Sequence, residues 1–299
     1  MTKHVDAQQY ADAYNDALTK GFEELQDKME VGDPLAETNS YAEFRNLLMN
    51  RIQGWDDKPL ESGETANDIL EREADSDDFW DFIYNISFLV DEDLPDQVKL
   101  TLSQRADETI DVFHRWIDEA DWTESDDGVA SEELQVAVMA LKLLAQWEDL
   151  SEFPTWVERF SKLEKPAMLF SEAMIQYSAT IPHLSLGVLM DFLENTDEDE
   201  MSLQGREYLL VALTEAAKSD ALREELLWAG DQETYQKLQD RSYKILRRYF
   251  LDRDPRVIAA ICLGDLGHPR GVALLRSYII RHEHDVDRQL YYEILSSIK

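Results

Sequence analysis

The residues best suited to metal chemistry lie near the end of the chain, where His282, Glu283, His284 and Asp285 are consecutive. Imidazole and carboxylate groups are common protein ligands for zinc and similar divalent metals. On a helix, however, residues two apart point to different sides, whereas helical metal motifs use positions i and i+4. We therefore predict a solvent-exposed turn and no metal site. If a loop brought ligands together here, they would be His282, His284 and Asp285. No cofactor is expected.

Nucleophilic catalysis would need a partly exposed side chain close to a base. The single cysteine, Cys262, lies between Ile261 and Leu263, and His268 is near it only in sequence. A buried structural thiol is therefore the better interpretation. The 63 acidic residues make chance carboxylate pairs inevitable, so such pairs do not indicate a hydrolase. We predict no catalytic residues and expect that the chain is not an enzyme.

Basic side chains gather near the C-terminus. Arg241, Lys244 and Arg248 fall on one face of a predicted helix, and three more arginines lie in the helix predicted over 269–283. We predict a positive strip that contacts a partner, formed by Arg241, Lys244, Arg248, Arg270, Arg276 and Arg281.

Seven tryptophans are present, and most lie in apolar stripes that predict packing between helices. Trp55 and Trp122 differ because acidic residues flank them at predicted helix ends. Tryptophan is enriched among the residues that dominate binding energy at protein interfaces. We therefore predict that Trp55 and Trp122 are exposed and contact a partner.

The net charge of the chain is −34, and it is unevenly distributed. Residues 1–130 hold 34 acidic and 10 basic side chains, whereas residues 236–299 hold 8 and 12. So acidic a surface repels nucleic acid and anionic membranes. It indicates either adaptation to salt or acid, or a surface that captures a basic protein. The single cysteine and the absence of an apolar leader at the N-terminus favour a cytoplasmic location.

Apolar residues recur at helical spacing along the whole chain, and no convincing strand emerges. The pattern predicts a helix over 65–92 that breaks near Asp75, and one continuous helix over 95–120. From residue 131 the predicted helices are short and paired, at a spacing typical of helical solenoids. We divide the chain into an acidic helical region, 1–130, which is a cap or a set of divergent repeats, and a repeat region, 131–299.

The run Leu263-Gly264-Asp265-Leu266-Gly267-His268-Pro269-Arg270 resembles the turn between the two helices of HEAT-like repeats. His268 stands where that family often has aspartate, and Arg288 occupies the usual arginine position of the next repeat. The resemblance covers 254–298, whereas over 131–253 only the pairing of helices supports it. It implies a right-handed α-α superhelix, most often one that binds other proteins.

These observations favour a scaffold that binds a protein or peptide along a groove. One alternative is an acidic inhibitor or immunity protein whose residues 1–130 block a basic enzyme such as a nuclease. Another, drawn from the resemblance, is a HEAT-like enzyme, either a tetrapyrrole lyase or a DNA glycosylase.

Overall fold

The computed structural model describes residues 3–30, 41–60, 62–90, 93–125, 128–252, 254–282 and 287–298. Regular secondary structure in these ranges is helical, and the extended pairings are the isolated bridges Pro59–Thr65 and Thr123–Pro166. The prediction of an all-α chain is therefore confirmed. None of the described helices is long and apolar enough to cross a membrane.

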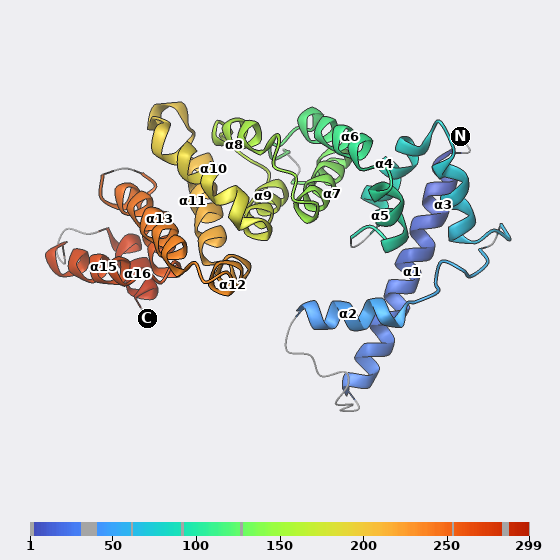
Figure 1. Cartoon of the computed structure of the whole chain (residues 1–299), viewed down its shortest axis with the longest axis horizontal. Helices are drawn as coiled ribbons and strands as arrows, with labels where there is room; N and C mark the ends of the chain where they lie inside the picture. The colour runs from blue at the N-terminus through green and yellow to red at the C-terminus, as the bar shows by residue number, and fades with distance from the viewer. Residues whose placement is uncertain are drawn as a thin grey trace. The chain divides into compact units, whose positions relative to one another are not determined.

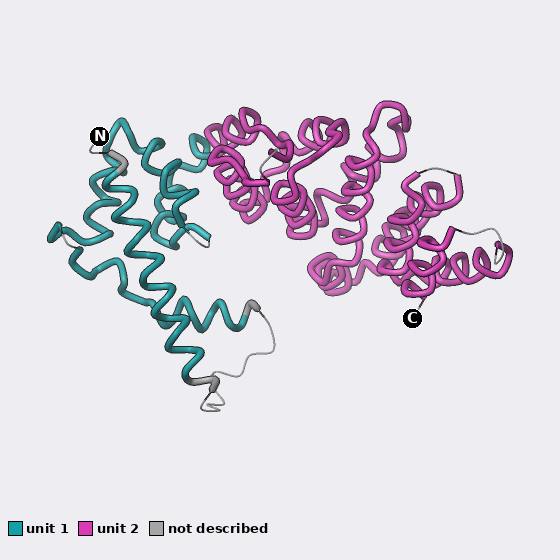
Figure 2. Tube along the Cα trace, turned by 180° about the vertical axis from the view of Figure 1, so that it is seen from behind, with its two compact units in different colours: residues 1–109 teal, residues 110–299 magenta. Residues whose placement is uncertain are grey.

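The chain forms two compact units, Met1–Thr109 and Ile110–Lys299 (Figure 2). The division falls inside helix α6 (Ala106–Glu119), ahead of the boundary that the sequence suggested at residue 130. The reason lies in the side chains of the second half of α6. Phe113 stacks on Trp147 at 6.2 Å, and His114 Nε2 lies 2.6 Å from Asp149 Oδ2. These contacts attach that half of α6 to the helices that follow it.

Unit 1 is built on the 28-residue helix α1 (Lys3–Glu30). It packs against α2 (Tyr41–Arg51), α3 (Ala66–Ala74) and α4 (Phe79–Leu89). The core is aromatic: the ring of Trp55 lies 5.5 Å from that of Tyr10 and 5.0 Å from that of Tyr14. Unit 1 therefore has an apolar interior of its own despite its acidic composition.

The predicted break near Asp75 is confirmed, since α3 ends at Ala74 and α4 begins at Phe79. The single helix predicted over 95–120 is wrong, because α5 (Asp96–Ser103) and α6 are separate. Arg105, between them, donates to the carbonyl of Ala74 and lies over the ring of Phe79 at 4.7 Å. A contact with a helix earlier in the chain thus accompanies the break.

From residue 131 onward, unit 2 follows the predicted arrangement of short, paired helices. The helices are α7 (Glu132–Gln146), α8 (Phe153–Ser161), α9 (Met168–Thr180), α10 (Pro182–Asn195), α11 (Leu203–Lys218), α12 (Asp220–Trp228), α13 (Gln232–Asp252), α14 (Arg256–Asp265), α15 (Pro269–His282) and α16 (Arg288–Ser297), with a 3-10 turn at Glu198–Glu200. Gly267 follows α14 with φ +65°, and Pro269 opens α15. Left-handed glycine and helix-opening proline are the usual stop and start signals.

The helices of unit 2 pack in two rows (Figure 1). In one row α7 packs on α9, α9 on α11, α11 on α14 and α14 on α16. In the other, α8 packs on α10, α10 on α13 and α13 on α15. The short helix α12 is an insertion between α11 and α13, which are members of different rows. Each pair therefore buries its apolar faces against the pairs before and after it.

Candidate functional site

Two of the six basic residues predicted to bind a partner are instead bound to α10. Arg241 Nη2 lies 2.5 Å from Asp191 Oδ1 and 2.6 Å from Glu194 Oε2, and these hydrogen bonds raise the pKa of Arg241 above its usual range. Arg248 donates to the backbone carbonyls of Leu193 and Glu194, at the C-terminus of α10. Arginine there satisfies carbonyls that have no helical partner. Both residues hold α13 to α10, which the sequence prediction did not anticipate.

The other four basic residues are exposed: Lys244, Arg270, Arg276 and Arg281. Arg270 Nη1 lies 3.6 Å from Asp240 Oδ1, with 66% of its side chain accessible. On α15, Arg270 and Arg281 are three turns apart and share a face, whereas Arg276 points about a third of a turn away. A single positive strip therefore does not form along this helix, although each of these residues stays a candidate for partner binding.

The prediction that Trp55 and Trp122 are exposed is wrong, because they are only 6% and 0% accessible. Trp55 belongs to the aromatic core of unit 1, and Trp122 is enclosed in unit 2. The exposed tryptophan is instead Trp228, the last residue of α12, at 89% accessible. The one signal in the sequence for its exposure is its position at the end of a short predicted helix, two residues before Gly230. In the structure Gly230 has φ +73°.

The metal candidates are only partly within the described structure. His284 and Asp285 lie outside the described residues, and the ring of His282 lies 4.5 Å from that of Tyr278. Among the residues that the structure describes, no group of three or more His, Cys, Asp or Glu side chains is arranged to hold a metal ion.

Cys262 is buried, as predicted, and is 2% accessible. Burial raises its thiol pKa to about 12, against an unfolded value near 8.5. A thiol held in its neutral form is not a nucleophile.

The shifted thiol makes stability depend on alkaline pH. Above about pH 8.5 the unfolded chain loses this proton while the folded chain keeps it, so the free energy of unfolding falls as pH rises. We expect a loss of roughly 1.4 kcal/mol per pH unit up to about pH 12. The measurement is the free energy of unfolding in urea of the wild type and of Cys262→Ala at pH 8 to 11. The titration of tyrosine and lysine is common to both proteins, so the difference between their pH slopes is the contribution of the thiol. Equal slopes in the two proteins would contradict the prediction.

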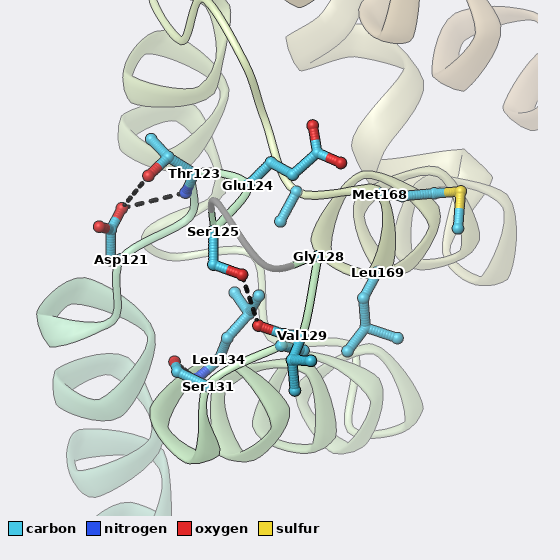
Figure 3. A pocket seen from close by; sticks show the side chains of 12 residues that line it. Asp121, Thr123, Glu124, Ser125, Gly128, Val129, Ser131, Leu134, Met168 and Leu169 are labelled. Atoms are coloured by element: carbon cyan, nitrogen blue, oxygen red, sulfur yellow. Dashed lines mark hydrogen bonds between the residues drawn. The ribbon is translucent and has the colours of Figure 1, made fainter.

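A pocket with a volume of about 420 Å³ lies in unit 2 (Figure 3). It is lined by residues of the segments 121–125 and 128–131, by Leu134 on α7, and by the start of α9 at residues 167–169. Two segments distant in sequence therefore build it, the loop between α6 and α7 and the first turn of α9.

A short antiparallel pairing holds these segments together. The backbone N–H of Ala167 donates to the carbonyl of Trp122 at 2.8 Å, and that of Glu124 donates to the carbonyl of Lys165 at 2.9 Å. On the other side, Ser131 caps α7 by accepting the N–H of Leu134 at 3.2 Å. Both walls of the pocket are thus fixed by backbone hydrogen bonds.

The pocket combines apolar and acidic side chains. Val129 is 65%, Met168 67% and Leu169 37% accessible, whereas Leu134 is buried. Figure 3 shows Val129 and Leu169 near Ser131 and Leu134 at the start of α7, Met168 extending away from them, and Asp121 at the opposite end of the loop. The Thr123 hydroxyl and N–H both donate to Asp121 Oδ1, which lowers the pKa of this carboxyl. None of the described residues that line the pocket is a histidine, cysteine or lysine.

Comparison with protein-family models, with curated proteins and with solved structures gave no significant match.

Proposed function

We propose that this chain is a helical-repeat interaction module of the HEAT-like kind, and that it binds a segment of another protein at the pocket between the α6–α7 loop and α9. One observation carries the proposal: three exposed apolar residues, Val129, Met168 and Leu169, line one preformed pocket. Scattered exposed apolar residues are ordinary, but a group of them around a concavity is typical of a binding site.

The architecture supports the same proposal. Stacked helix pairs leave extended surfaces that helical-repeat proteins use for partners. The turn between α14 and α15, with Gly267 left-handed and Pro269 opening the next helix, is what the HEAT-like resemblance predicts. Binding without catalysis, in the cytoplasm, belongs to this proposal.

The experiment selects ligands from a random peptide library on the purified full chain and measures their affinity by fluorescence anisotropy. The test variant is Val129→Ser/Met168→Ser, and the matched control is Ile280→Ser on α15, an exposed apolar residue that does not line the pocket (78% accessible). We expect at least tenfold weaker binding to the test variant, which corresponds to about 1.4 kcal/mol, and unchanged binding to the control.

Both variants should fold normally because exposed positions change stability by no more than about 0.5 kcal/mol. Peptides that bind the test variant as well as the wild type would show that binding occurs elsewhere, and failure to select any peptide would also count against the proposal.

A further inference from the structure

We infer that the occupant of the pocket is a partner segment with one apolar anchor side chain flanked by lysine or arginine. The inference rests on the proposed function and names the chemistry of its ligand. The anchor and the flanking charges follow from different parts of the pocket.

The anchor follows from the apolar part. Val129, Met168 and Leu169 line a volume of about 420 Å³, together with the buried residue Leu134. This volume lies near the small end of the range for ligand sites, so it suits one large side chain better than a helix laid along the surface. Burying such a side chain against three half-exposed apolar residues is the main source of affinity.

The flanking charges follow from the acids around that volume. Asp121 and Glu124 line the pocket. Glu132 and Glu133 are exposed directly after Ser131, and Glu172 is exposed one helical turn after Met168. Like-charged side chains so placed attract a cationic segment and repel an anionic one.

The nearby basic residues offset only part of this acidity. Arg159 donates to the carbonyls of Asp118 and Ala120 at 2.6 and 2.8 Å, and its guanidinium lies over the ring of Trp122. Its charge acts on Asp121, but it does not line the pocket and leaves Glu124 and the exposed glutamates around it uncompensated. Lys165 is exposed, but it contributes its backbone carbonyl to the wall and does not line the pocket.

Charge also argues against a second copy of the chain as occupant. Each copy carries a net charge of −34. Among the described residues, the most exposed large apolar side chain, Trp228, belongs to a helix with exposed Glu224 and Glu225. Inserting it into the acidic pocket of another copy would bring like charges together. Ile280 lies beside the exposed Arg281 on α15, and the sedimentation measurement below tests whether it fills the pocket of a second copy.

The test uses three labelled twelve-residue peptides that share one central phenylalanine and differ in their flanks, which carry lysine, serine and glycine, or glutamate. Anisotropy with the full chain at low salt should show the lysine peptide binding at least tenfold more tightly than the neutral one. It should show no binding of the glutamate peptide. In 0.5 M NaCl the difference between the lysine and neutral peptides should shrink, because salt screens the flanking charges.

Glu124→Gln is the first charge variant, and Asp121→Asn/Glu124→Gln the second. The first keeps the Asp121–Thr123 hydrogen bonds, so a structural change cannot explain its effect. We expect each to weaken the lysine peptide, the double variant at least fivefold. The control Asp220→Asn/Glu224→Gln on α12 should change affinity less than twofold.

Different failures have different meanings. Equal affinity for the lysine and neutral peptides, or no effect of the charge variants, would overturn this inference while the proposed function stood. Peptide binding that is insensitive to Val129→Ser/Met168→Ser would overturn the proposed function itself. Sedimentation that shows a dimer, lost on the same double substitution, would identify a second copy as the occupant and overturn the inference.

Discussion

Replacing Gly205 by alanine is expected to lower the free energy of unfolding of unit 2 by about 2–3 kcal/mol. Alanine is ordinarily the better residue inside a helix, by about 1 kcal/mol, so the expected sign is opposite to that of helix propensity. A β-carbon at this position of α11 would lie 2.4 Å from the carbonyl oxygen of Ser161 and 2.7 Å from its carbonyl carbon. Both are backbone atoms, so no side chain can turn aside to make room.

Hydrogen bonds keep the two helices at this separation. The N–H of Ser202 donates to the carbonyl of Ser161 at 2.8 Å, and the Ser202 hydroxyl donates to the carbonyl of Leu163 at 2.5 Å. The same hydroxyl accepts the N–H of Gly205 at 2.8 Å. Moving α11 away from the end of α8 to admit a methyl group would strain the two bonds to Ser161 and Leu163, in a buried environment where unmade hydrogen bonds are costly.

Gly187→Ala is the matched control. Gly187 lies inside α10, and a β-carbon there would meet no atom within 4 Å. This substitution should raise the free energy of unfolding by about 0.5–1 kcal/mol. Urea unfolding followed by circular dichroism compares the two variants with the wild type. If both substitutions stabilised the protein, α11 would not approach α8 as closely as the structure shows.

Most helix ends of unit 2 could be predicted because their signals are local. Pro182 and Pro269 begin helices, Ser131 and Ser202 cap them, and Gly267 follows one. Each of these residues acts through its own backbone or its nearest neighbours, so its effect depends little on the rest of the fold.

The features that the sequence did not predict depend on contacts between segments that are distant in the chain. The break between α5 and α6 occurs where Arg105 reaches α3 and α4, and Arg241 is paired because α10 lies beside α13. The pocket combines the α6–α7 loop with the first turn of α9. Periodicity within one helix identifies its apolar face but not the segment that covers it, so such sites are not visible in the sequence.

The second large expected effect is a loss of stability on replacing Trp122, whose burial the sequence did not predict. Trp122→Ala should lower the free energy of unfolding by about 3–5 kcal/mol, the usual cost of removing a buried aromatic side chain. Trp122 is fully buried, its ring lies 4.4 Å from that of Phe170, and the Arg159 guanidinium carbon lies 3.8 Å from the centre of its ring. Its indole N–H donates to the carbonyl of Ile117 at 2.8 Å.

The same substitution at Trp228 provides the control, because it removes the same atoms from a side chain that is 89% accessible. Trp228→Ala should change the free energy of unfolding by no more than about 0.5 kcal/mol. Trp122→Phe should fall between the two, since it keeps an aromatic ring but loses the hydrogen bond to Ile117. Urea unfolding of the three variants tests this order. Equal effects of the two alanine substitutions would mean that Trp122 is as exposed as its acidic flanks suggest.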